Sequence, residues 1–208
     1  MKKQKSRKIL AMSVIAFMLT TACKKEKEVA PIPEQPATIT NVFAFVKPGN
    51  RSVFSVNGMH NGFPYNYANG FILEVASEKE KNKFAINFMF DFSPYYKDTL
   101  HTTWQTNTEE LLSMDASAIS KVVTKSNPTV GSVTYSISGT DTIYRKIINA
   151  EMEVTVPAGK FTCAKIKEYY SNKAEYMEEY YSLKDGLIKR DLLNSANPYV
   201  SELVSKNF

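Results

Sequence analysis

The 208-residue sequence has few of the residues from which catalytic and metal sites are usually built. It holds two histidines, His60 and His101, and two cysteines, Cys23 and Cys163. The histidines stand far apart without a nearby cysteine pair, so the ligand spacing of a zinc site is missing. Phosphate-binding glycine loops and nucleophile-elbow motifs are missing too. We therefore expect no metal, no cofactor and no enzyme activity, with a hydrolase as the less favoured alternative.

The sequence also lacks an apolar run of the roughly 20 residues that a membrane-spanning helix needs. Its main apolar stretch, 9–22, follows five positive charges within residues 2–8 and ends at Cys23. This order is typical of a secretory signal peptide, which we assign to residues 1–22. The segment Leu19-Thr20-Thr21-Ala22-Cys23 resembles the lipobox of bacterial lipoproteins. The resemblance implies that Cys23 carries acyl chains such as palmitate and anchors the protein to the outer membrane.

Without this leader the chain has no net charge. The whole sequence has 26 Lys and Arg against 21 Asp and Glu, and five of the basic residues lie within positions 2–8. A neutral mature chain gives no electrostatic reason to expect nucleic-acid binding. Residues 23–40 combine a charged run with three prolines, a composition typical of an extended tether. Both the periplasmic and the cell-surface face of the membrane remain open.

The remaining residues, 41–208, suit a single β-rich domain. Because an acylated Cys23 leaves Cys163 without a partner for a disulfide, this domain must depend on a hydrophobic core. Its strongest pattern is an alternation that places five apolar side chains on one face of a strand: Phe84, Ile86, Phe88, Phe90 and Phe92. Turn residues separate further predicted strands, over residues 42–46, 52–56, 71–76, 133–137, 142–148, 151–156, 161–169, 176–183 and 187–192.

One segment departs from this alternation. Asn107 followed by Glu109 and Glu110 is typical of a helix N-terminus. Apolar residues then recur at helical spacing until Asn127-Pro128. We expect one helix, over about 108–123, packed on the sheet.

The last third of the chain carries three short motifs: Val156-Pro157-Ala158-Gly159-Lys160-Phe161, Tyr180-Tyr181 and Gly186-Leu187-Ile188-Lys189. Together they resemble the "VPAGTF … WY … GLVK" ending of β-rich Bacteroidota lipoproteins of uncharacterised function. The resemblance implies a fold similar to that of lipoprotein carriers. We therefore predict a single antiparallel curled sheet, or half-barrel, with one helix packed on it. A β-sandwich is the alternative.

We expect the protein to bind rather than to catalyse. A curled sheet offers an apolar ligand or an envelope partner a concave face, to which Phe84, Phe88 and Phe90 would contribute. His60 and Tyr65 belong to a polar, glycine-bearing stretch, 57–67, that we interpret as a surface loop. That loop and the exposed tyrosines support the alternative of a surface glycan- or protein-binding module. Two short patterns resemble O-glycosylation signals of exported Bacteroidota proteins, at Thr99 and Thr142.

Overall fold

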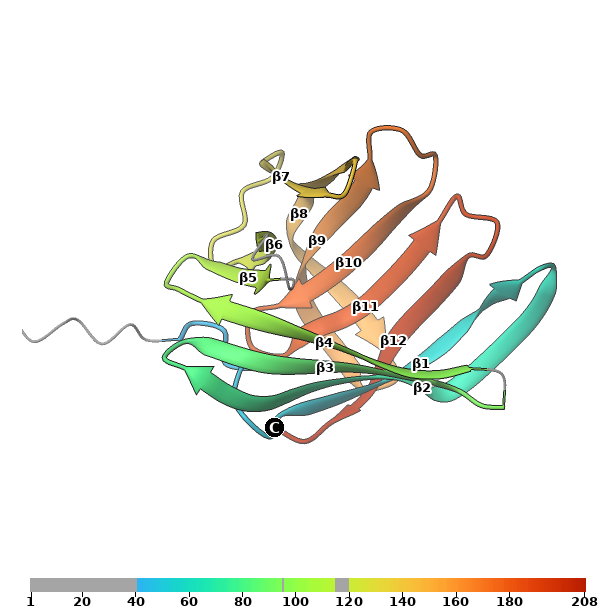
Figure 1. Ribbon diagram of the computed structural model, residues 1–208, viewed down its shortest axis with the longest axis horizontal. Helices are drawn as coiled ribbons and strands as arrows, with labels where there is room; N and C mark the ends of the chain where they lie inside the picture. The colour runs from blue at the N-terminus through green and yellow to red at the C-terminus, as the bar shows by residue number, and fades with distance from the viewer. Residues whose placement is uncertain (1–40, 95, 115–119) are drawn as a thin grey trace, which may run out of the picture. The chain divides into compact units, whose positions relative to one another are not determined.

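β-strands account for most of the computed structural model, which describes residues 41–94, 96–114 and 120–208 (Figure 1). The predicted signal peptide, Cys23 and the tether lie outside the described residues. The strands are β1 (Arg51–His60), β2 (Phe63–Glu80), β3 (Lys83–Phe92), β4 (Tyr96–Thr106), β5 (Glu110–Met114), β6 (Ser120–Lys125), β7 (Val133–Ser138), β8 (Asp141–Val156), β9 (Gly159–Tyr170), β10 (Tyr176–Ser182), β11 (Gly186–Leu193) and β12 (Tyr199–Lys206).

All 12 strands belong to one sheet, in the order β6-β5-β4-β3-β2-β1-β12-β11-β10-β9-β8-β7. Neighbouring strands are antiparallel, and the last strand pairs with the first. The sheet curls until β6 and β7, its two end strands, approach each other, so that it is barrel-like and nearly closed (Figure 1). The prediction of a single curled antiparallel sheet is confirmed, and the sandwich alternative is not.

The core lies on the inner face of the curl. Alternate residues of each strand point inward, as the period of two requires. Side chains from both halves of the sheet are completely or almost completely buried there: Phe54, Ile86, Trp104, Leu111, Ile166, Ile188 and Leu203. Burying each of these side chains contributes roughly 1.5–3 kcal/mol to folding.

Residues 41–50, before β1, form a series of turns that we call the plug. The strand predicted over 42–46 is therefore wrong. The turns of the plug are held by local hydrogen bonds, such as that from the Val46 amide to the Phe43 carbonyl at 2.9 Å. Phe43, Phe45 and Val46 are all buried, which an extended strand with alternating faces would not allow. The Phe45 ring meets Trp104 of β4 edge-on at 6.1 Å and lies against Gly186 of β11. The plug therefore bridges opposite halves of the sheet.

The predicted helix over 108–123 is also wrong, because the residues described on either side of 115–119 form strands β5 and β6. Asn107 does cap a turn, since its side-chain oxygen accepts the backbone N–H groups of Glu109 and Glu110 at 2.7 Å. That turn leads into a hairpin rather than a helix. Leu111 of β5 and Val123 of β6 are buried. None of the residues described forms a helix of the length and hydropathy that crossing a membrane requires.

The stretch predicted as a loop over 57–67 is instead the end of a long hairpin. β1 continues to His60 and β2 starts at Phe63. The turn consists of Asn61 and Gly62, both with positive φ (49° and 83°), the geometry for which an Asn-Gly pair is favoured. Gly58, near the start of that predicted loop, lies inside β1 and leaves room for the Tyr65 hydroxyl.

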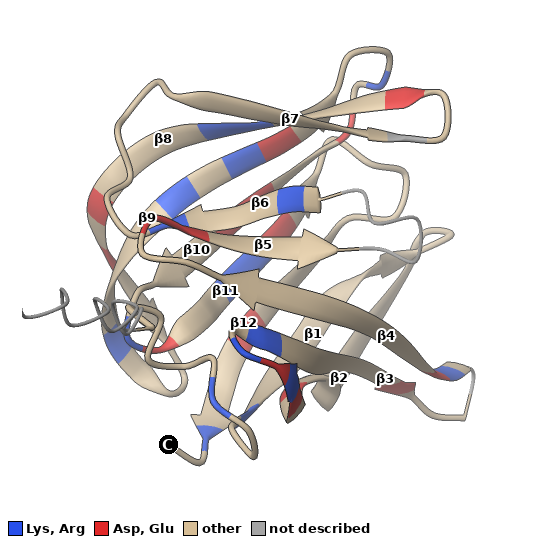
Figure 2. Cartoon of the chain, turned by 60° about the vertical axis from the view of Figure 1, so that its left-hand side comes forward, with Lys and Arg blue, Asp and Glu red and all other residues tan. Residues whose placement is uncertain are grey.

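The two halves of the sheet differ in chemistry. In Figure 2 the ribbon colours of basic and acidic residues lie close together along β8, β9 and β10, whereas β4 has neither colour over most of its length. Aromatic residues concentrate on β2 and β3 instead, where several rings pack face to face. The curl brings the charged half and the aromatic half toward one interior.

Candidate ligand-binding cavity

The aromatic half supplies one wall of an interior cavity. Phe71 of β2 pairs directly with Phe90 of β3, and their rings stack with centroids 5.3 Å apart. Phe92 continues the row, with its ring 6.1 Å from Phe90 and 6.4 Å from Tyr65. Such packed rings form a rigid apolar surface.

The charged half supplies the other wall through a row of residues in register. Glu179 of β10 pairs with Arg190 of β11, which pairs with Ser201 of β12. Ser201 in turn pairs with Val56 of β1, and Val56 with Tyr67 of β2. Directly paired residues share one face of a sheet. This row therefore runs across the inner face from a carboxylate to the aromatic wall.

A cavity of about 120 Å³ lies where the two walls meet. Five strands contribute to it, and its lining is mainly apolar with a small polar part: Val56, Tyr65, Phe71, Phe90, Phe92, Arg190, Tyr199 and Ser201. The deep residues Val56, Phe71 and Ser201 are buried, whereas Tyr65 and Tyr199 are half-buried. Gly70 helps to shape this wall, since a Cβ there would lie 3.0 Å from both Phe92 and Val56.

Two polar groups of the cavity have unused hydrogen-bonding capacity. Ser201 is 2% exposed, and among the described residues its hydroxyl has no hydrogen-bonding partner. Arg190 donates from Nε to Glu179 Oε1 at 2.9 Å, and its Nη2 forms an ion pair with the same oxygen at 2.7 Å. Its Nη1 group makes no hydrogen bond to any residue in the described ranges. The guanidinium lies 5.5 Å from the centroid of the Phe71 ring, so it joins the polar row to the aromatic wall.

Arg190 belongs to an interior ion network, which we define as Lys121, Arg145, Glu168, Glu179 and Arg190. Arg145 donates to Glu168 and, at 2.7 Å, to Glu179, while Lys121 lies 3.2 Å from Glu168. Three cations face two carboxylates, so the network has one excess positive charge.

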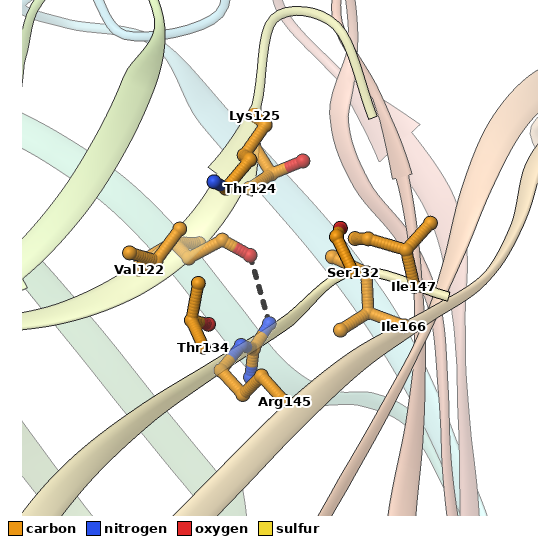
Figure 3. Close-up of a pocket in the computed structure, with 9 residues that line it drawn as sticks. Val122, Thr124, Lys125, Ser132, Thr134, Arg145, Ile147 and Ile166 are labelled. Carbon is orange, nitrogen blue, oxygen red and sulfur yellow. Dashed lines mark hydrogen bonds between the residues drawn. The ribbon is translucent and has the colours of Figure 1, made fainter. Parts of the chain in front are cut away.

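The network also links the end strand β6 to β8, the neighbour of the other end strand. Arg145 of β8 donates to the Val123 carbonyl of β6 at 2.8 Å (Figure 3). Beside this bond is a void of about 10 Å³ lined by Arg145 and Thr124. Arg145 Nε and Thr124 Oγ1 both lack a partner within the described part of the chain. The void is at the lower limit of the volume that one water molecule needs.

The network determines the charge states of its members. Burial alone would raise the pKa of Glu179, but the charges of Arg145 and Arg190 outweigh burial and hold that pKa well below its usual range. Burial alone would lower the pKa of Arg190, and Glu179 outweighs it, so the guanidinium stays charged. Burial, helped by Glu179, raises the pKa of Tyr181. The interior therefore holds permanent charges beside a neutral phenol.

The structure brings together two of the five residues predicted to bind a ligand, Tyr65 and Phe90. Phe88 packs against Phe71 and Trp104 just beyond the cavity, and Phe84 lies in the core. His60 is exposed at the end of β1, away from these residues. Of the two predicted glycosylation sites, Thr99 is exposed on β4 and Thr142 is half-buried on β8.

The polar residues of the site were not among our predictions, although the sequence carries a signal for them. On β8, β9 and β11, one charged residue stands at a position where the alternation of the strand would place an inward-facing apolar residue. Arg145 stands between Ile143 and Ile147, and Glu168 follows Ile166 at the same spacing. Arg190 likewise stands two places after Ile188. A charge at such a position must find an inward partner, because an isolated buried charge is costly.

Comparisons with known proteins give the fold and no family. No protein-family model and no curated protein sequence matches the chain. A solved structure from Bacteroides fragilis NCTC 9343, of a protein described as exported and as having a YmcC-like fold, is similar with a TM-score of 0.55. The two chains are 13% identical, and the match covers 81% of this chain and 100% of the other. The chain therefore has a fold of the YmcC-like type.

Proposed function

We propose that the protein is a membrane-anchored bacterial envelope protein that binds an apolar ligand inside its curled sheet and does not catalyse a reaction. The observation that carries this proposal is the cavity of about 120 Å³ between the aromatic wall and the polar row. Cavities of about 150 Å³ lined by apolar side chains bind molecules of the size of benzene. The site therefore suits one small ring, or one end of a longer molecule that enters past Tyr65 and Tyr199.

The envelope location is supported by two independent observations. The N-terminal 23 residues have the order of a signal peptide and lipobox. The structurally similar Bacteroides fragilis protein is described as exported. In this proposal two or more acyl chains on Cys23 hold the protein on the outer membrane, because one chain alone gives only marginal binding. The test is fractionation of cells: the Cys23→Ser variant should leave the acylated membrane fraction and lose labelling by a palmitate analogue. Unchanged labelling would contradict the anchor.

The cavity is tested with the full chain and a neutral, water-soluble aromatic probe, 3-phenylpropan-1-ol. Saturation-transfer NMR should show contact between the probe ring and the wild-type protein. The Val56→Phe variant should lose this signal, because a ring placed at Val56 fills the cavity. Ser55→Phe is the matched control, since Ser55 is the next residue and points to the other face of β1. Equal signals from both variants would contradict binding in the cavity.

A second candidate function, recognition of an anionic glycan, is favoured by a groove on the outer face. This groove of about 380 Å³ is lined by Tyr169 and Tyr176 together with lysines from β8, β9 and the following turn. Lys167 lies 3.7 Å from the centroid of the Tyr176 ring. Tyr180 and Tyr181 of the C-terminal motif are buried and are not available for stacking on a glycan. A glycan array should show acidic polysaccharides binding to the wild type and not to Tyr176→Ala, and absence of any signal would remove this candidate.

A further inference from the structure

The cavity's polar end indicates which chemical group the ligand carries. Arg190 and Ser201 both line the cavity and are paired in register on β11 and β12. Resting on the proposed binding function, we propose that the ligand is an apolar molecule bearing a carboxylate, which Arg190 and Ser201 bind while Phe71 and Phe90 hold the apolar part.

The unused donors of these two residues match a carboxylate. The Ser201 hydroxyl is buried and without a partner in the part of the chain that the structure describes. A buried polar group without a partner is destabilising, and a ligand acceptor would satisfy it. Arg190 has Nη1 free of hydrogen bonds to the described residues, and a guanidinium binds carboxylates through directed, charge-assisted hydrogen bonds. Together they provide donors from two neighbouring strands.

The charge of the interior ion network favours an anion over a cation or a neutral group. The charges of Arg145 and Arg190 balance those of Glu168 and Glu179, and Lys121, whose side chain is 36% exposed, adds one positive charge at the edge of the network. A ligand carboxylate would meet Arg190, the cation of the network that lines the cavity. An amine would instead place a second positive charge next to Arg190, which a low-dielectric interior disfavours.

The position of Arg190 explains how one site binds both the carboxylate and the apolar part of the ligand. Glu179 fixes the guanidinium through Nε and Nη2, so the side chain is held in place before a ligand arrives. Its central carbon lies over the Phe71 ring, 5.5 Å from the centroid. A ligand that reaches the guanidinium therefore has its apolar part against the aromatic wall. A fixed donor loses less conformational entropy on binding than a free side chain does.

The experiment compares four soluble probes on the full chain by calorimetry at pH 7: 3-phenylpropanoate, 3-phenylpropan-1-ol, 3-phenylpropylamine and hexanoate. The aromatic acid should bind at least about tenfold more tightly than the alcohol, and the amine should bind most weakly. Hexanoate binding as tightly as 3-phenylpropanoate would support the carboxylate and assign an alkyl body. Weaker hexanoate binding would support the carboxylate and assign an aromatic one.

Variants of Arg190 and Ser201 test recognition of the carboxylate separately from binding of the apolar part in the cavity. Ser201→Ala should reduce the preference for the acid over the alcohol by about threefold to tenfold, and Arg190→Lys should reduce it as well. Neither change leaves a buried carboxylate without a cation, so both variants should fold. Ser205→Ala, at an exposed position of the same strand, should leave the preference unchanged.

The results distinguish failure of the carboxylate inference from failure of the proposed binding function. Equal affinity for the acid and the alcohol, or an unchanged preference in Ser201→Ala, would overturn the carboxylate and leave the proposed binding function intact. If none of the four probes bound, both the inference and the proposed function would be overturned.

Discussion

Replacing Glu179 by Gln tests whether the interior ion network stabilises the fold. Glu179 accepts hydrogen bonds from Arg145 and Arg190 and is 3% exposed. The Gln side chain keeps the shape and removes the charge, so the buried Arg145 and the half-buried Arg190 lose their shared counterion. Breaking a buried ion pair in this way costs about 3–5 kcal/mol, a large part of the roughly 5–15 kcal/mol that stabilises a typical domain.

The neighbouring residue provides a matched control. Glu178 is on the same strand and points to the outer face, where it lies 2.8 Å from Lys165. Both side chains of that pair are partly exposed to solvent (16% and 22%), so Glu178→Gln should cost about 1 kcal/mol or less. The two variants have the same change in composition and net charge, and they differ only in the face of the strand.

Urea unfolding followed by far-UV circular dichroism measures the difference. With a slope of about 2 kcal/mol per molar urea, a loss of 4 kcal/mol lowers the midpoint by about 2 M. The Glu178→Gln midpoint should fall by about 0.5 M or less. Equal shifts in the two variants, or no shift in Glu179→Gln, would refute the assignment of Glu179 to a buried network.

The pH dependence follows from the lowered pKa of Glu179, caused by Arg145 and Arg190 acting against burial. A carboxylate with a lowered pKa in the folded state stabilises the fold fully above its unfolded pKa of about 4.3. That contribution falls as the pH decreases below this value toward the folded pKa. Between pH 5 and 2 the wild type should therefore lose stability more steeply than Glu179→Gln, and parallel curves would contradict the shift.

Three further predictions concern the core. Burial, with a smaller contribution from Asp185, raises the pKa of the Cys163 thiol to about 12; at pH 8 on the order of one thiol in ten thousand is then ionised, so iodoacetamide should label Cys163 only after unfolding. Rapid labelling of the folded protein would contradict this. Gly70→Ala places a Cβ 2.8 Å from the Tyr67 Cβ and should lower stability by about 1–3 kcal/mol, whereas an unchanged urea midpoint would show that the wall has room to relax. Phe45→Ala removes the ring that contacts Trp104 and should cost about 3–5 kcal/mol and shift the emission of the single tryptophan to longer wavelength; unchanged emission would contradict the plug.

The fold was largely predictable where local pattern and tertiary packing agree. The alternation from Phe84 to Phe92 indicated a strand because burial on one face requires it, and β3 occupies that range. The segment 108–123 was wrongly predicted as a helix, because Asn107 forms the same local hydrogen bonds in a hairpin turn as at a helix N-terminus. Only pairing with β4, a contact outside the segment, selects strands there. We did not predict strands β4 and β12, because apolar and polar residues alternate only weakly along them.

The site was only partly predictable, because register decides which residues share it. Tyr65 and Phe90 were expected from their aromatic character and lie in the cavity lining. Arg190 and Ser201 meet them only because β12 pairs with both β11 and β1, a long-range arrangement that no local pattern specifies. The charges at inward phases of β8, β9 and β11 were visible in the sequence. Their partners were not, because partners depend on how neighbouring strands align.

The most direct measurement is a crystal structure of the full chain grown with 3-phenylpropanoate. We expect the ring against Phe71 and Phe90, with one carboxylate oxygen about 2.7–2.9 Å from a nitrogen of Arg190 and another about 2.5–2.7 Å from the Ser201 hydroxyl. Density for the acid elsewhere on the protein, or a carboxylate turned away from Arg190, would contradict the central claim that the curled sheet is a binding site with an aromatic wall and a cationic end.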